Sequence, residues 1–295
     1  MKTMLHTLAL AGALVLLPTA AALADFADAE VGARGISMGG AFVAVEGDPA
    51  SLFWNPAAIH PGRRVEVTGM RTRLFDGVEG LTEDFVGITG AVNEDLALGF
   101  GWTRSGLEDT YHEDVVTGAV AWRMPRLPLS IGASVLFYGA DAPGYEELND
   151  PNYLGSQWEP SLSIGFLYEW TENLHLGASF ENLLKPEMTL LANTSDVDQI
   201  GGQRRFGMAY LFEDLVRFTA ELRHHDFPEY YDSDWTLHGG AESWFNEILA
   251  LRVGIDDGDL TAGAGLIVKR VRFDGGLVTN ERLGNTFRAA ITLGY

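Results

Sequence analysis

Hydrophobic and polar residues alternate along most of the chain, from residue 64 to the last residue. In 249–256, one face carries only long aliphatic side chains, and the other carries Ala250, Arg252, Gly254 and Asp256. A period of two residues is typical of β-strands whose two faces meet different surroundings. We therefore predict fourteen strands, at residues 64–73, 84–92, 96–102, 115–123, 129–138, 160–170, 174–183, 204–212, 216–224, 236–243, 249–256, 260–269, 271–278 and 287–295.

The connections between these strands indicate which kind of β-protein they form. A soluble sandwich with one wetted face would show the same alternation. Here, however, long and short connections alternate almost throughout, with a tight turn at 256–259. Long loops at one end and tight turns at the other are typical of outer-membrane barrels. We predict an all-β fold, a transmembrane antiparallel β-barrel of about 14 strands with its N-terminal segment inside the lumen.

Aromatic residues near the predicted strand ends favour the membrane barrel over a soluble periplasmic β-protein. Trp and Tyr collect at the two interfaces of a bilayer, because their rings have an apolar body and a polar edge. The outward aromatic residues expected to form such a girdle are Trp102, Trp122, Trp170, Phe180, Trp244 and Tyr295.

The first residues resemble an export signal. Lys2 precedes an apolar run from Leu8 to Leu17, and small residues at 22–24 are typical of a cleavage site before Asp25. The apolar run is too short for a membrane helix. The sequence has no cysteine, which excludes disulfides and a lipid-bearing cysteine. We predict a signal peptide at 1–24, an N-terminal plug segment at 25–63 and the barrel at 64–295.

The stretch 31–59 is apolar and rich in Gly and Ala, yet turn-forming residues at 39–40, 47–49 and 55–56 interrupt it. Such a stretch should be packed inside the barrel rather than form one long helix. Its motifs resemble the N-terminal signature of the FadL-like outer-membrane barrel superfamily, and the PorV/PorQ-like branch is the most similar in style. The residues that carry the resemblance are Met38, Gly39, Gly40, Trp54, Asn55, Pro56 and Ala57.

This resemblance implies a plug in the lumen and two alternative functions. FadL-like proteins transport hydrophobic compounds across the outer membrane, whereas PorV/PorQ-like proteins attach to the type IX secretion machinery and bind exported cargo. The implied partners are outer-membrane lipids, a hydrophobic small-molecule ligand or secretion-system proteins, and the barrel-assembly machinery during biogenesis. The implied localisation is the outer membrane of a Gram-negative cell. Candidates for an apolar capture surface in the outer loops are Met188, Leu190, Leu191, Tyr145 and Tyr153.

Charged residues on the strands are expected to face the lumen. An arginine at mid-bilayer on the lipid face would cost about 2–4 kcal/mol, so the register that turns the charges inward is favoured. We expect these residues to pair with Glu30, Arg34 and Glu46 of the plug segment, and a substrate path along them is the alternative. The predicted lumen-facing charges are Arg217, Glu221, Arg252, Arg272, Asp274 and Arg288.

The net charge of −21 argues against nucleic acid as a partner, because its phosphates would be repelled. Most of the predicted outer loops are acidic, which suits solubility and contact with lipid head groups through divalent cations. A Ca²⁺ site at 256–259 is the alternative, although a hairpin turn rich in Asp and Gly needs no metal.

No residue pattern indicates catalysis. Loop acids near His112 and His225 could be arranged as a protease-like site, but chance placement of so many acids gives the same picture. His224, His225 and His238 lack the spacing of metal ligands. We predict a protein that is not an enzyme, with no cofactor and no metal site. The loop acids in question are Asp109, Glu113, Asp226 and Asp232.

Overall fold

The computed structural model describes residues 30–60, 64–76, 78–107, 110–144, 151–192, 198–226, 234–280 and 284–294. The predicted signal peptide lies outside these residues, as do 25–29 and 61–63 of the predicted plug segment. No helix in the described part of the chain is long and apolar enough to cross a membrane.

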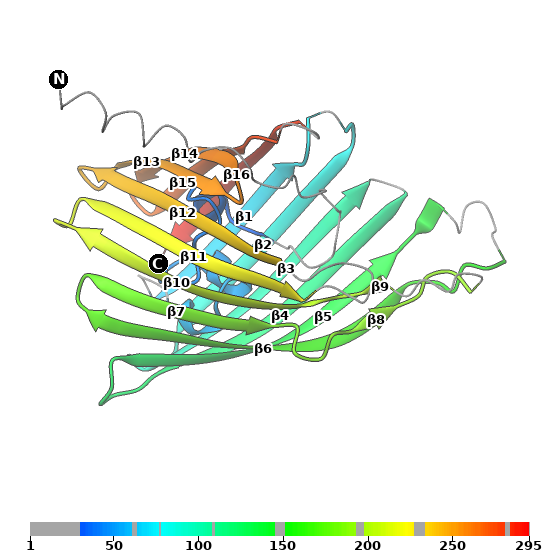
Figure 1. Cartoon of the computed structure of the whole chain (residues 1–295), viewed down its shortest axis with the longest axis horizontal. Coiled ribbons are helices and arrows are strands. Elements are labelled where there is room, and N and C mark those ends of the chain that lie inside the picture. Colours follow the sequence, from blue (N-terminus) through cyan, green and yellow to red (C-terminus); the bar gives the residue numbers. More distant parts are fainter. Residues whose placement is uncertain are drawn as a thin grey trace, which may run out of the picture.

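Fourteen antiparallel strands form a closed barrel, because β1 pairs with both β2 and β16 (Figure 1). Every other barrel strand pairs with its neighbours in sequence, and β7 pairs with β10 across a long connection. The barrel strands are β1 (Val65–Arg73), β2 (Leu81–Ala91), β3 (Leu96–Leu107), β4 (Tyr111–Arg123), β5 (Leu129–Asp141), β6 (Gln157–Thr171), β7 (Leu174–Glu181), β10 (Gly202–Phe212), β11 (Val216–Asp226), β12 (Asp234–Phe245), β13 (Leu249–Asp256), β14 (Asp259–Val268), β15 (Val271–Val278) and β16 (Thr286–Gly294).

The predicted antiparallel barrel of fourteen strands is confirmed, and the largest differences lie at strand ends on the side of the long loops, the loop side. There β3 runs to Leu107 instead of residue 102, and β4 starts at Tyr111 instead of residue 115. These extensions pair polar residues, such as Arg104 with Asp114. Beyond the apolar band both faces are polar, so the alternation disappears while the ladder of backbone hydrogen bonds continues. The opposite end of the barrel, with the short turns, is the turn side.

The two faces of the barrel differ sharply in polarity. On β13, Val253 is 59% exposed on the outer face, whereas its neighbour Arg252 is 2% exposed inside. An outer face covered by large apolar side chains suits a lipid environment. Trp122 and Trp170 lie on this face, as predicted, but the prediction for Trp244 is wrong. Its ring lies 5.6 Å from the guanidinium of Arg252 in the lumen, because β12 places Phe245 outward instead.

The long connection between β7 and β10 contains a small hairpin, β8 (Glu187–Met188) and β9 (Asp198–Gln199). It packs against the loop between β5 and β6 through backbone hydrogen bonds, for example from Leu154 N to Leu190 O at 2.9 Å. Met188 is 1% exposed, so its predicted role in a capture surface is wrong. Its apolar side chain builds the small core of these loops, and Leu190 packs beside that core. Tyr145 lies outside the described residues.

Residues 30–60 lie inside the barrel and are called the plug segment here (blue in Figure 1). Three short helices form within it: α1 (Ala33–Ile36), η1 (Pro49–Phe53) and η2 (Pro56–Ala58). The two 3₁₀ helices start with proline, and their first turns are capped by the Asp48 and Asn55 side chains, each accepting a backbone N–H at 3.0 Å. Helix α1 lies against β14–β16, and η2 lies against β4–β6. The plug segment therefore spans the lumen from wall to wall.

Candidate functional site

The plug segment touches the wall where the wall has glycine. A Cβ atom on Gly132 would lie 2.2 Å from the Pro56 carbonyl carbon, and one on Gly165 would lie 2.0 Å from Asn55 Oδ1. Contacts this short exclude any side chain without a shift of the backbone. Plug and wall are therefore fitted to each other at the level of the main chain. Gly177, Gly240 and Gly254 also lie against plug backbone, and Gly99 and Gly263 lie against the side chains of Leu52 and Ser37.

The predicted Met38-Gly39-Gly40 motif makes a bend against β12–β14. Gly39 and Gly40 have φ of +68° and +69°, a conformation that favours glycine. A Cβ on Gly39 would also lie 2.3 Å from the carbonyl oxygen of Ile255. The Gly39 N–H donates to Thr261 Oγ1 at 3.0 Å, and the same hydroxyl donates to the Ser37 carbonyl at 3.1 Å. Met38 is fully buried.

The second predicted motif, at 54–57, connects the plug segment to β6 and to itself. Asn55 Nδ2 donates to the carbonyls of Val43 at 2.7 Å and Phe166 at 3.0 Å, while its Oδ1 caps η2 at Ala57. Trp54 Nε1 donates to the Val31 carbonyl at 2.9 Å. The Asn55 side chain thus caps η2 with its amide oxygen and binds the wall with its amide nitrogen.

Six charged side chains of alternating sign form a closed ring between plug and wall, which we call the ionic ring. None of these side chains is more than 14% exposed. Two belong to the plug segment and four to β12, β13 and β15. The members, in ring order, are Arg34, Glu242, Arg252, Asp274, Arg272 and Asp48.

The plug enters the ring through two residues. Arg34 donates to both carboxylate oxygens of Glu242, at 2.8 and 2.7 Å. Asp48 accepts from Arg272 at 2.5 Å and lies 3.7 Å from Arg34, which closes the ring. Bidentate arginine–carboxylate pairs are among the strongest polar contacts in proteins. Removing one partner would leave a buried charge uncompensated.

The wall completes the ring. Arg252 donates to Glu242 and to Asp274, both at 2.8 Å, and Arg272 donates to Asp274 at 2.7 Å. A fourth arginine, Arg217, reaches Glu242 only at 3.4 Å. Four arginines therefore face three carboxylates, so this part of the lumen has one positive charge in excess.

A second ionic chain lies nearer the loop side. Arg205 donates to Glu181 at 2.9 Å and to Glu221 at 3.1 Å, and Arg223 lies between Glu221 and Glu30 of the plug. Glu221 also accepts the backbone N–H groups of residues 42 and 43 at 3.0 Å. The guanidinium of Arg205 is 4.7 Å from the centre of the Trp54 ring. Neutral and charged contacts together hold the plug to β10 and β11.

All six predicted lumen charges face the lumen, but they have different surroundings. Four belong to the two ionic groups, and Arg217 borders the ring. Arg288 lies apart from the plug, with Glu83 at 3.6 Å. Glu242, Arg205 and Arg223 were not among the predicted site residues, although the period of two residues places each on an inward face. The path of the plug segment determines which inward charges have a partner, and the sequence does not reveal that path.

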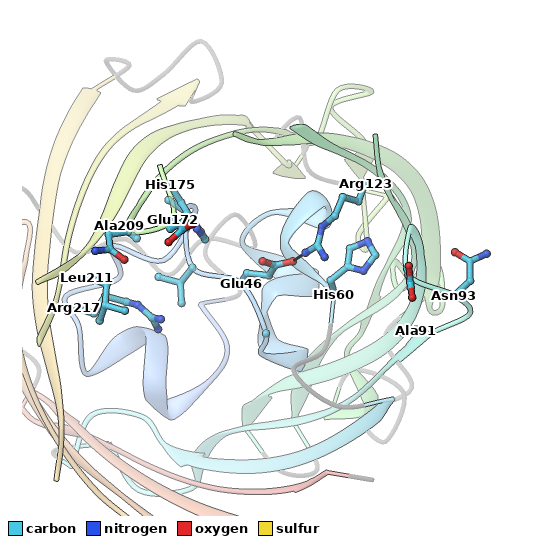
Figure 2. A pocket seen from close by; sticks show the side chains of 15 residues that line it. Glu46, His60, Ala91, Asn93, Arg123, Glu172, His175, Ala209, Leu211 and Arg217 are labelled. Carbon is cyan, nitrogen blue, oxygen red and sulfur yellow. Dashed lines mark hydrogen bonds and ion pairs between the residues drawn. The ribbon is translucent and has the colours of Figure 1, made fainter. Parts of the chain in front are cut away.

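A cavity of about 460 Å³ lies at the turn side, between the plug segment and the wall, and is called the turn-side cavity (Figure 2). The charged and imidazole side chains that line its inner part are Glu46, His60, Arg123, His175 and Arg217. Glu46 of the plug accepts from Arg123. Burial raises the pKa of Glu46, and burial lowers the pKa of His60, as does Arg123. At neutral pH His60 is therefore uncharged.

A second, smaller cavity lies toward the loop side. It has a volume of about 20 Å³ and lies between plug residues Leu52, Phe53 and Pro56 and the wall. This volume is enough for about one water molecule. Of these two cavities, the turn-side cavity is by far the larger.

Within the described residues, the candidates for metal binding or catalysis make ion pairs with neighbouring side chains. Within the described residues, no group of three or more His, Asp or Glu could hold a metal ion. His238 pairs with Asp256 at 2.8 Å, and Asp226 accepts from Lys185 at 2.5 Å. His112 lies 3.4 Å from Asp141. Asp109 and Asp232 lie outside the described residues.

No protein-family model and no curated protein matches the sequence. Solved structures do share its fold. A FadL homologue from Pseudomonas aeruginosa matches with a TM-score of 0.65 and 14% identity, over 92% of this chain and 99% of the other. The monoaromatic hydrocarbon channel CymD matches with a TM-score of 0.66 and 13% identity, over 90% and 97%. The Pseudomonas putida toluene transporter TodX matches with 0.62 and 14%, over 89% and 96%.

Proposed function

We propose that this chain is an outer-membrane channel of the FadL type, which carries small hydrophobic molecules across the outer membrane. The observation that carries the proposal is the combination of an apolar outer face with a lumen occupied by the chain's own N-terminal segment, in the fold of CymD and TodX. The names of these two proteins state monoaromatic hydrocarbons and toluene as cargo, and uncharged molecules of this class are the cargo proposed here.

The orientation follows from the connections. Long loops face the outside in barrels of this kind, so the turn side with its cavity faces the periplasm. The outer face then contacts outer-membrane lipids, and the barrel-assembly machinery inserts the protein after export. The predicted signal peptide and its cleavage remain part of this proposal.

Passage of cargo requires the plug segment to move, because the segment spans the lumen from α1 against β14–β16 to η2 against β4–β6. The wall at β12–β15 holds the plug through the ionic ring, whereas β3–β6 hold it mainly through packing. We therefore expect residues 50–58, from η1 to η2, to shift while α1 and Asp48 stay attached through the ionic ring.

The test is uptake of radiolabelled toluene by cells that produce the protein, with two cross-linked forms as a matched pair. The natural chain has no cysteine. In the first form, Leu52→Cys is combined with Gly99→Cys, because a Cβ at 99 would lie 3.3 Å from Leu52 Cγ. In the second, Ser37→Cys is combined with Gly276→Cys, where a Cβ would lie 2.9 Å from Ser37 Oγ. Both distances suit a disulfide.

We expect cells that produce the protein to take up more toluene than cells without it. Oxidation of the first cysteine pair should abolish this uptake, and a reductant should restore it. The second pair should leave uptake unchanged when oxidised. Equal uptake with and without the protein would contradict transport. Normal uptake through both oxidised forms would contradict plug movement only. Co-purification of secretion-machinery subunits or exported proteins, with no uptake, would support the PorV/PorQ-like role instead.

A further inference from the structure

The turn-side cavity has the size and lining of a ligand site, and nothing above assigns it a ligand. Its volume of about 460 Å³ lies within the range of small-molecule pockets. Apolar side chains of the plug and of β10 form part of its wall, among them Val45, Ala209 and Leu211. Arg123 and Arg217 reach into it from opposite walls, with Glu46 from the plug beside Arg123 (Figure 2).

Both arginines have unused hydrogen-bond donors. Arg217 makes one contact of 3.4 Å, to a Glu242 carboxylate that already accepts from Arg34 and Arg252 at 2.7–2.8 Å. Nε of Arg123 is buried and has no hydrogen-bond partner among the described residues. Its closest acid on that side, Glu169, lies 4.0 Å away, beyond hydrogen-bond range. A guanidinium group can only donate hydrogen bonds, so the unused N–H groups of both arginines can bind a hydrogen-bond acceptor.

One ring nitrogen of a third group in the cavity also lacks a partner among the described residues. His60 is 6% exposed, and its Nε2 has no hydrogen-bond partner among the described residues. A buried polar atom without a partner costs roughly 1–3 kcal/mol. Such atoms in a native structure usually face water or a ligand. His60 lies in the plug segment, so a molecule that contacts it also contacts the plug.

The charge balance of the inner wall indicates whether the cavity favours an anionic or a cationic ligand. The ionic ring together with Arg217 has one positive charge in excess, and Glu46 is paired with Arg123. Of the other acids near the cavity, Glu94 and Glu172 lie exposed in turns at its rim and Glu169, beside Arg123, is 40% exposed, so water screens them. The positive charge in excess lies at Arg217, so the part of the cavity around Arg217 favours an anion.

We propose that the turn-side cavity binds a small organic carboxylate, which enters from the periplasmic side. The carboxylate accepts from the guanidinium group of Arg217, and its apolar part lies on Val45, Ala209 and Leu211, which line the same side of the cavity. This ligand differs from the uncharged cargo proposed above, and its binding does not require transport. Because the site is partly built from residues 44–47 and 60 of the plug, occupancy would also hold the plug in its closed position.

The experiment is calorimetric titration of the purified, membrane-reconstituted protein with benzoate and with benzyl alcohol. The two probes have the same ring and differ in charge. We expect benzoate to bind at least ten times more tightly than benzyl alcohol. Arg217→Gln should weaken the binding of benzoate at least tenfold and leave the affinity for benzyl alcohol unchanged. Arg288→Gln is the matched control, since Arg288 also has a single ion-pair contact in the lumen but lies away from the cavity.

A second variant keeps the charges and fills the space. Leu211→Trp should abolish binding of benzoate, since Leu211 lines the cavity. Equal affinities for the two probes in the natural protein, or no benzoate binding at all, would overturn the proposal without any variant. Equal weakening by Arg217→Gln and Arg288→Gln would also overturn it. Because binding is measured without transport, a failure of toluene uptake has no bearing on this result.

Discussion

The two sides of the plug segment share close packing against wall glycines, and they differ in the number of buried ion pairs. On the ionic side, β10–β15, ion pairs such as Arg34–Glu242 and Arg272–Asp48 also connect plug and wall. On the packed side, β3–β6, the attachment consists mainly of apolar residues and backbone that lie against wall glycines. The Asn55 amide and Glu46–Arg123 add polar contacts there.

The difference determines how each side responds to a change. Ion pairs buried in the lumen depend on every member, because loss of one carboxylate leaves its arginines without a counter-charge. Packing against glycine depends on shape, and it weakens gradually as atoms move apart. An attachment that is costly to break on one side and easily deformed on the other is suited to a plug that swings rather than leaves the barrel.

The largest effect is expected from Glu242→Gln on the ionic side. The amide keeps the shape of the carboxylate but removes the charge that Arg34, Arg252 and Arg217 share. Breaking such a buried pair costs about 3–5 kcal/mol. The plug should loosen, and single channels in planar bilayers should show frequent openings where the natural protein is silent.

Glu169→Gln is the control for this change. Glu169 is 40% exposed and lies 4.0 Å from Arg123, so its charge contributes little to the attachment of the plug. It should remain as silent as the natural protein. Silent traces from both variants would mean that the ionic ring does not hold the plug.

A smaller effect is expected from Gly132→Val on the packed side. The new side chain would collide with the plug backbone at Pro56, and overpacking of this kind costs about 1–3 kcal/mol. Hydrogen exchange at residues 55–60 should become faster, while exchange at 33–40 stays slow. The matched control is Gly118→Val on the neighbouring strand β4, where an added Cβ meets nothing within 4 Å. Equal exchange in both variants would contradict a tight fit at η2.

These features differ in how far the sequence reveals them. The strands are predictable because each turns one face to lipid, which imposes the alternation of apolar and polar residues. The inward direction of charges such as Arg252 follows from the same rule. Trp244 was misplaced because an aromatic residue near a strand end fits either face, and only the pairing of β12 with β13 assigns it to the lumen.

The pairing inside the lumen has no such local signal. Arg34 and Glu242 are 208 residues apart in sequence, and their contact depends on the path of the plug and on the register of β12 together. The alternation assigns Gly132 to the inward face and Gly118 to the outward face, but it does not reveal that Gly132 lies against the plug backbone at Pro56. The turn-side cavity follows from these contacts, so its residues could not be grouped beforehand.

The smallest expected effect is a change in the attachment of the plug segment with pH, and its sign differs between Glu30 and Glu46. Burial opposes ionisation of Glu30, but Arg223, Arg205 and His238 outweigh it and lower the pKa of Glu30 to about 2. Because this pKa is below the unfolded value, the carboxylate stabilises the plug above about pH 4.5 and ceases to do so as the pH falls toward 2. Burial raises the pKa of Glu46, so protonation of Glu46 favours the folded state, and its effect on stability has the opposite sign to that of Glu30.

From pH 6 to pH 3.5, we expect the attachment of the plug near residues 30–40 to weaken by about 1 kcal/mol. Hydrogen exchange corrected for intrinsic rates would show this, and Glu30→Gln should remove the pH dependence. If the dependence persists in that variant, another group in the lumen is responsible for it.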